Sequence, residues 1–173
     1  MEMTGLDPEK EGILEIAVII TDGDLTILGE ELSLVVKQPA ALLKKMDSWN
    51  QKQHKKSGLV DDVLKSKITV KEAEKQTLDF IKKYCKPKKN SLAGNAIYHD
   101  RRFIIKYMPR LNKFLHYRLV DVSTLKNLIQ RWYPKHKTYP KKMDMHRASS
   151  DIRESIEELR YYRKTFFREK ASE

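Results

Sequence analysis

The sequence predicts an α/β fold in which a mixed β-sheet is covered by helices. Residues 12–20 form a short apolar run rich in β-branched side chains, which is typical of a buried strand. Asp22 and Gly23 then supply a turn signal, and residues 25–36 alternate imperfectly as a returning strand. Helical and strand-like segments alternate after this hairpin. We therefore expect one α/β domain over residues 1–173, without an internal boundary.

Capping signals divide the rest of the chain. Asp47 and Ser123 are suited to cap helices, Thr69 forms a capping box with Glu72, and Pro109 can open a helix. These signals predict helices over 39–46, 48–54, 70–85, 100–107, 109–117, 124–132 and 150–167. Short strands are expected over 91–97 and 119–122.

The composition favours a polyanionic partner. The chain has 173 residues, with 35 Lys and Arg against 24 Asp and Glu, and a formal charge of +11. Such an excess speeds encounter with nucleic acids, although lysine-rich surfaces also serve solubility alone. No apolar run is long enough to cross a membrane, the start is unlike a secretory signal, and Cys85 can form no intrachain disulfide.

Three acidic segments are candidates for metal-dependent chemistry. Glu2, Asp100 and Asp151 come from separate elements, and converging carboxylates can hold two divalent ions for phosphodiester displacement. Hard oxygen ligands suit Mg²⁺ or Mn²⁺, and His146 can take the proton of the attacking water. The pattern alone leaves other interpretations open: Glu2 as a frayed terminus, the two aspartates as helix caps, and the histidine as a loop residue.

These segments resemble those of oligoribonuclease, a DEDDh-type exonuclease family with a ribonuclease H-like fold. The similarity runs from Glu2 to about Phe167. Besides the acidic segments it includes residues 46–50, 57–59, 106–109, 116–118, 121–126, 131–132, 151–155 and 158–163. The resemblance implies a 3′→5′ exoribonuclease that degrades short oligoribonucleotides, especially dinucleotides, to nucleoside monophosphates with two Mg²⁺ or Mn²⁺ ions.

Carried over by position, the resemblance assigns roles in catalysis. Glu2, Asp100 and Asp151 correspond to three of the family's four metal-binding carboxylates, and His146 to its general base.

The resemblance also assigns residues that contact the substrate's bases. Leu6 is similar to the apolar wedge between the two bases, Trp49 to a residue packing on the substrate, and His54 to one near the scissile region. Without the family, Leu6 and Trp49 can equally be core residues, and His54 a solvated residue at a helix end.

A second group is similar to the pocket that caps the substrate's 5′ phosphate. It contains Arg118, Ser123 and, from the other subunit of a homodimer, Tyr117. A closed cap implies a preference for dinucleotides, because it leaves no room for further nucleotides beyond the 5′ phosphate. The open alternatives are a surface ion pair for Arg118 and a helix cap for Ser123.

The chain departs from the family pattern at its start. The family motif reads Asp-Leu-Glu-Met-Thr-Gly-Leu-Asp, and here Met1 stands at the leucine position, so the first aspartate and most of the first strand have no counterpart. We expect a truncated sequence or a misplaced start codon. Ala96 stands for the usual serine, and Ser149 and Ser150 replace an apolar residue and an aspartate before Asp151.

Two other functions remain as alternatives. One is a catalytically impaired nucleic-acid-binding relic, and the other is a sibling exonuclease that trims longer RNA or DNA.

The resemblance places the protein in the cytoplasm, with the mitochondrion as the alternative if a presequence was lost.

Overall fold

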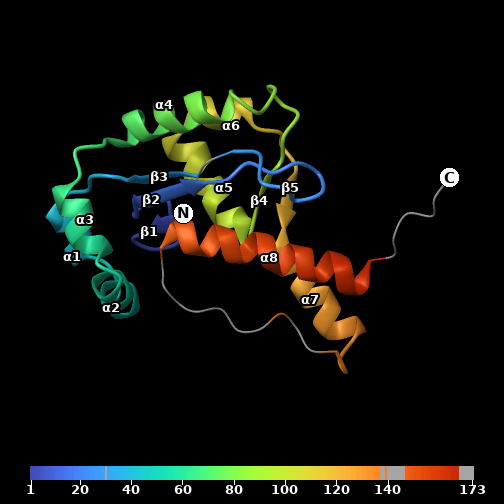
Figure 1. Cartoon of the computed structure of the whole chain (residues 1–173). Coiled ribbons are helices and arrows are strands. Elements are labelled where there is room, and N and C mark those ends of the chain that lie inside the picture. The colour runs from blue at the N-terminus through green and yellow to red at the C-terminus, as the bar shows by residue number, and fades with distance from the viewer. Residues whose placement is uncertain (30, 137–138, 140–146, 168–173) are drawn as a thin grey trace.

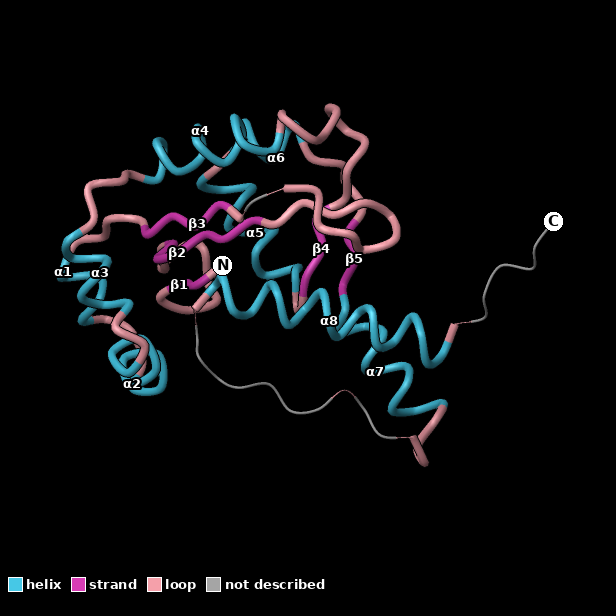
Figure 2. The backbone as a smooth tube through the Cα atoms, viewed as in Figure 1, coloured by secondary structure: helices cyan, strands magenta, loops and turns pink. Residues whose placement is uncertain are grey.

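The computed structural model describes residues 1–29, 31–136, 139 and 147–167. Its strands form two small sheets (Figures 1 and 2). β1 (Glu2–Met3), β2 (Ile13–Val18) and β3 (Leu32–Val35) are antiparallel, in the order β1-β2-β3. β4 (Leu92–Gly94) and β5 (Leu119–Asp121) run parallel. The expected mixed sheet is therefore present in two parts. β1, which pairs with β2, is only two residues long, and among the described strands none pairs with both β2 and β4 to join the parts.

Helices cover both sides of these strands. α4 and α6 lie on one side of the strands, and α8 crosses the opposite side (Figure 1). The helices described are α1 (Ala40–Lys44), α2 (Ser48–Lys56), α3 (Leu59–Lys65), α4 (Val70–Ile81), α5 (Ile97–Tyr107), α6 (Pro109–Phe114), α7 (Val122–Trp132) and α8 (Ala148–Phe166). Among these helices, none is long and apolar enough to span a membrane.

The predicted hairpin is confirmed, but its second strand is shorter than expected. Oδ1 of Asp22 accepts from the backbone N–H groups of Asp24 at 2.9 Å and Thr26 at 2.8 Å. Leu25 has a φ of 67°, a left-handed conformation that turns the backbone instead of extending it. β3 consequently begins at Leu32 and not at Leu25.

Most predicted caps are confirmed. The side chain of Asp47 accepts from the N–H of Asn50, and that of Thr69 accepts from the N–H of Glu72. The prediction that Ser123 caps α7 is wrong. Asp121 is the cap and accepts from the N–H of Ser123, because α7 begins one residue before the serine.

Some helix bounds also differ from the prediction. α3 is not among the predicted helices. Gly58 follows the end of α2 in a left-handed conformation, with a φ of 75°, and a new helix starts at the next residue. α4 ends at Ile81 and α6 at Phe114, each a few residues before the predicted end.

The largest group of buried apolar side chains lies between the strands and helices α4, α5 and α6. Ile13, Ile16, Phe103, Ile104 and Met108 are among its most buried members. A smaller group joins β2 to α1 and α3, and a third joins α7 to α8. The largest group packs β1 and α5 together, and α8 lies against β2 and β4. β1, α5 and α8 carry the predicted carboxylates.

Candidate active site

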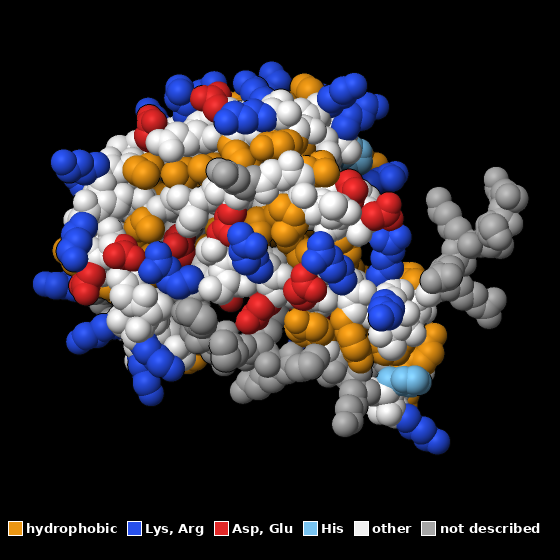
Figure 3. All heavy atoms as spheres, in the orientation of Figure 1, with side chains coloured by type: hydrophobic (Ala, Val, Ile, Leu, Met, Phe, Trp, Pro, Cys, Tyr) orange, Lys and Arg blue, Asp and Glu red, His pale blue; other side chains and the backbone are white. Residues whose placement is uncertain are grey.

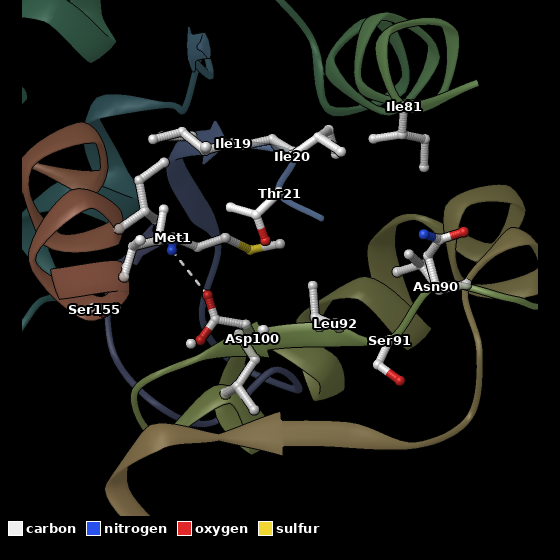
Figure 4. Close-up of a pocket in the computed structure, with 18 of the residues that line it drawn as sticks. Met1, Ile19, Ile20, Thr21, Ile81, Asn90, Ser91, Leu92, Asp100 and Ser155 are labelled. Atoms are coloured by element: carbon white, nitrogen blue, oxygen red, sulfur yellow. Dashed lines mark hydrogen bonds and ion pairs between the residues drawn. The ribbon is translucent and has the colours of Figure 1, made fainter. Parts of the chain in front are cut away.

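The three predicted carboxylates come together around the amino group of Met1. Glu2 lies on β1, and Asp100 and Asp151 lie in the first turns of α5 and α8. The amino nitrogen donates to Oδ1 of Asp100 at 2.8 Å, and both groups are largely buried (Figure 4). Neither aspartate is the N-cap of its helix, so the interpretation of these residues as helix caps is wrong.

The electrostatics of this cluster show how closely the acids interact. Burial lowers the pKa of the Met1 amino group, but the surrounding carboxylates, Asp100 before Glu2 and Asp151, together raise it above its ordinary value. Burial raises the pKa of Glu2 to about 8; the ammonium opposes this, and Asp151, which shares a hydrogen bond with Glu2, adds to it. Crowded carboxylates of this kind are stabilised by positive charge.

The chemistry of these donors fits a hard divalent cation. Glu2, Asp100 and Asp151 supply only oxygen ligands, which Mg²⁺ and Mn²⁺ prefer. Over the described part of the chain, no three His, Cys, Asp or Glu side chains are already placed to hold an ion. Asp100 is engaged by the Met1 ammonium, and Glu2 shares its hydrogen bond with Asp151.

His54 lies against this cluster from helix α2. Its side chain is only 2% exposed, so the interpretation of His54 as a solvated residue is wrong. Nδ1 lies 3.8 Å from Oε2 of Glu2, and Nε2 lies 3.1 Å from the carbonyl oxygen of Met3. Helix α2 thereby holds strand β1 in place beside the acids.

Leu6 is presented on a loop that follows β1. The side chain is 57% exposed, so Leu6 is not a core residue. Thr4 and Gly12 close the base of the loop with two hydrogen bonds of 3.0 Å. Arg102 of α5 donates to the carbonyl of Leu6 at 3.3 Å, which ties the loop to the helix that carries Asp100.

Trp49 is also exposed, at 57%, and the interpretation of it as core is likewise wrong. It lies in the first turn of α2, the helix whose His54 contacts β1. An exposed indole is a surface on which a nucleobase can stack.

Tyr117 and Arg118 stand together just before β5. Tyr117 is 73% exposed and stacks on His116, with 4.5 Å between ring centroids and 29° between ring planes. The guanidinium carbon of Arg118 lies 5.5 Å from the centre of the Tyr117 ring, and its Nε donates to the tyrosine hydroxyl at 3.1 Å. A guanidinium held over an exposed ring can still offer its other N–H groups to a phosphate.

The hydroxyl of Ser123 is engaged inside the protein. It donates to Oδ1 of Asn95 at 3.0 Å and accepts from the N–H of Ala96 at 3.0 Å. A hydroxyl has one proton, so in this arrangement Ser123 has none to give to a phosphate. The remaining predicted residue, His146, lies outside the described residues.

A cavity of about 220 Å³ opens beside the acids, between β2 and β4. Figure 4 shows Met1 and Asp100 at its wall together with Ile19, Ile20 and Leu92. It occupies the place where the two small sheets face each other without hydrogen bonds.

Comparisons with known proteins identify the family. Residues 1–159 match the family model described as exonuclease. The oligoribonuclease of Dichelobacter nodosus is 50% identical over 96% of this chain and 92% of its own length. The human "Oligoribonuclease, mitochondrial" is 48% identical over 100% of this chain and 73% of its own length. The "Probable oligoribonuclease" of Caenorhabditis elegans is 48% identical over 96% of this chain and 86% of its own length. The chain belongs to the oligoribonuclease family.

Membership of the oligoribonuclease family makes the chain a nuclease with an exonuclease domain. It also accounts for the α/β architecture, which is that of the exonuclease fold. The relatives carry different compartment names, since the human and bovine proteins are called mitochondrial and the bacterial ones are not.

One group of residues next to the carboxylate cluster was missed by sequence reasoning. Glu15 lies in β2 and is 1% exposed. Arg147, the residue just before α8, forms an ion pair with the Glu15 carboxylate at 2.8 Å. The Glu15 carboxylate also accepts from the N–H of Ala148 at 2.8 Å, and Arg147 pairs with Asp62 of α3 at 2.9 Å. A glutamate inside an otherwise apolar strand was the signal that could have revealed this anchor for α8.

Proposed function

We propose that the protein is a 3′→5′ exoribonuclease that degrades short oligoribonucleotides, dinucleotides above all, to nucleoside monophosphates. The observation that carries the proposal is the meeting of Glu2, Asp100 and Asp151 from three separate elements around one buried positive charge. The oligoribonuclease names of relatives about half identical to this chain support RNA as the substrate.

The protein's own side chains bind and orient the substrate in this proposal. Leu6 and Trp49 offer exposed apolar surface to the two bases, and Arg118 with the Tyr117 ring binds the 5′ phosphate. Lysine and arginine side chains project around the outline of the molecule in Figure 3 and favour the approach of a polyanion. Ser123 joins the phosphate cap only if its hydroxyl leaves Asn95.

His146 is the proposed general base. It accepts a proton from the attacking water, whose oxygen bonds to phosphorus as the bond between phosphorus and the 3′ oxygen breaks. The leaving 3′ oxygen takes a proton from solvent, so the products are a nucleoside 5′-monophosphate and a shortened 3′-hydroxyl end. When bound to Glu2, Asp100 and Asp151, Mg²⁺ or Mn²⁺ would supply positive charge that stabilises the attacking and leaving oxygens.

A homodimer is part of the proposal. Tyr117 is 73% exposed, so its ring is accessible to a neighbouring subunit as well as to Arg118 of its own. Light scattering after size exclusion should give twice the mass of 20.4 kDa. A monomer would remove the cross-subunit role of Tyr117. The cytoplasm as the compartment, with the mitochondrion as the alternative, stays a prediction.

A second function has one observation in its favour. Asp100 is engaged by the Met1 ammonium, and the described residues hold no ready cation site. A protein that binds short RNA without cleaving it would have this arrangement.

One experiment separates the candidates. The chain is incubated with Mn²⁺ and a 5′-phosphorylated diribonucleotide, next to a longer RNA, and released monophosphate is followed by chromatography. Selective cleavage of the dinucleotide supports the proposal, preferred cleavage of the longer RNA indicates a trimming exonuclease, and tight binding without cleavage indicates the binding protein.

The phosphate cap is tested by Arg118→Ala. Affinity for the dinucleotide should fall more with the 5′ phosphate than without it. Arg110→Ala removes the same charge from an exposed position on α6 and is the matched control. An equal loss with and without the phosphate would remove Arg118 from the cap.

A further inference from the structure

Asn95 sits between β4 and α5, and its amide is hydrogen-bonded on both sides. Nδ2 donates to Oγ of Ser155 and to Oε2 of Glu158, each at 3.0 Å. Oδ1 accepts from the hydroxyl of Ser123 at 3.0 Å. Both protons of the amide are used on α8, while its oxygen is used on α7.

Glu158, the partner of Asn95 on α8, is 1% exposed and is fully supported by donors. Its Oε1 accepts from the hydroxyl of Tyr162 at 2.7 Å and lies 3.5 Å from Nζ of Lys126. Burial, followed by the hydrogen bond to Glu158, raises the pKa of Tyr162 far above its ordinary value, so this hydroxyl stays a donor. A buried carboxylate with several donors around it holds a fixed position.

The turn next to Asn95 sets the start of helix α5. Ala96 has a φ of 49°, a left-handed conformation that is costly for a residue with a Cβ. Its N–H is held by Oδ1 of Asp121 at 3.1 Å and by Oγ of Ser123 at 3.0 Å. α5 begins at the next residue and carries Asp100 in its first turn.

The same amide reaches the helix that carries Asp151. Oγ of Ser155, which accepts from Asn95, donates to the backbone carbonyl of Asp151 at 2.7 Å. Figure 4 shows Ser155 on the α8 side of the cavity that Asp100 also lines. Asn95 therefore connects the helix ends that bear two of the three site carboxylates.

We infer that Asn95 and Glu158 are positioning residues that set the placement of Asp100 relative to Asp151 for cation binding. The inference rests on the proposed exonuclease function, and it concerns residues that act through the carboxylates and not on the substrate. Partners that orient cation ligands typically change cation affinity by about 10–100-fold when they are removed.

The test reverses the direction of one hydrogen bond. Asn95→Asp keeps the shape of the side chain but replaces the donor to Glu158 by a second carboxylate. Adding Glu158→Gln restores the hydrogen bond in the opposite direction: the amide introduced at position 158 donates to the carboxylate introduced at position 95. Glu157→Gln is the matched control: it removes the same charge from the neighbouring position, which is 53% exposed.

Three readouts are taken on the full chain. Hydrogen–deuterium exchange compares peptides over 92–104 with peptides over 70–81. Mn²⁺ affinity is measured by electron paramagnetic resonance, and cleavage of the 5′-phosphorylated diribonucleotide gives kcat and KM separately. Thermal unfolding by circular dichroism confirms that each variant is folded at the assay temperature.

Asn95→Asp should raise exchange over 92–104 but not over 70–81, and should weaken Mn²⁺ binding at least about 10-fold. In the single variant Asn95→Asp, kcat should fall more than KM changes. The double variant should recover most of the exchange protection and most of the Mn²⁺ affinity. If Asn95→Asp does not fold, Glu158→Gln compared with Glu157→Gln gives the same contrast with a smaller effect.

Unchanged exchange over 92–104 in the folded Asn95→Asp variant would overturn the inference, as would a double variant no better than the single one. Equal exchange for Glu158→Gln and Glu157→Gln would also overturn it. A wild-type chain that cleaves no dinucleotide would instead count against the proposed function, since exchange and its rescue are measured without turnover.

Discussion

Nε2 of the buried His54 lies 3.1 Å from the main-chain carbonyl oxygen of Met3, and this contact joins helix α2 to strand β1. A carbonyl oxygen can only accept, so Nε2 carries the proton. β1 is two residues long and gains little from its own pairing, which makes the imidazole an important part of its anchoring.

His54→Ala should lower the free energy of unfolding by about 2 kcal/mol or more, because it leaves the Met3 carbonyl without this donor and opens space in a buried site. Urea denaturation measures the change. His54→Gln is the matched variant, since its amide can reproduce the donor at Nε2. Its loss in free energy of unfolding should be less than half of the loss in His54→Ala. Equal losses in the two variants would show that the hydrogen bond to Met3 contributes nothing.

Stability should fall as pH rises from about 5 to 8, because the pKa of Glu2 is raised from 4.5 to about 8 in the folded protein. Over this window the folded state keeps a proton that the unfolded state has released, so the free energy of unfolding decreases with pH. We expect Tm to drop by about 3 °C or more between pH 5.5 and 8.0, the shift that about 1 kcal/mol produces in a chain of this size.

Glu2→Gln supplies the control for this pH dependence. The amide does not titrate, so its Tm should vary less over the same range. A wild-type Tm that rises toward pH 8, or an equal slope in Glu2→Gln, would contradict the assignment of the proton to Glu2.

Arg147→Ala should destabilise the protein by about 3–5 kcal/mol, since it leaves the carboxylate of Glu15 buried without its charged partner. Lys75→Ala breaks the exposed pair with Asp79 on α4 and should destabilise the protein far less, because solvent screens this pair. Chemical denaturation of both variants checks the contrast. Similar values for the two would show that the Glu15 pair does not anchor α8.

Asp47→Ala should lower Tm by about 2–4 °C, because it removes the acceptor at the N-terminus of α2, the helix that carries Trp49 and His54. Asp47→Asn keeps an acceptor oxygen and should lose only a fraction of this. Thermal or urea unfolding measures both, and an Asp47→Asn loss as large as that of Asp47→Ala would point to charge and not to capping.

Local sequence signals account for much of the fold. The hairpin turn at Asp22 and the caps at Asp47 and Thr69 were predictable because each depends on a side chain and a backbone N–H only a few residues away. The shortened β3 and the cap at Asp121 were not, since they depend on the backbone conformation at Leu25 and on where α7 starts.

For the site, the sequence by itself determined the kind of chemistry: acidic, aromatic and basic residues in an order that resembles one nuclease family. Only the tertiary structure decided which of them meet. It placed Glu2 and Asp151 in hydrogen-bond contact, put His54 beside them, and turned the Ser123 hydroxyl toward Asn95. The buried anchors at Glu15 and Glu158 follow the same rule, because a charge can be buried only where distant parts of the chain bring it partners.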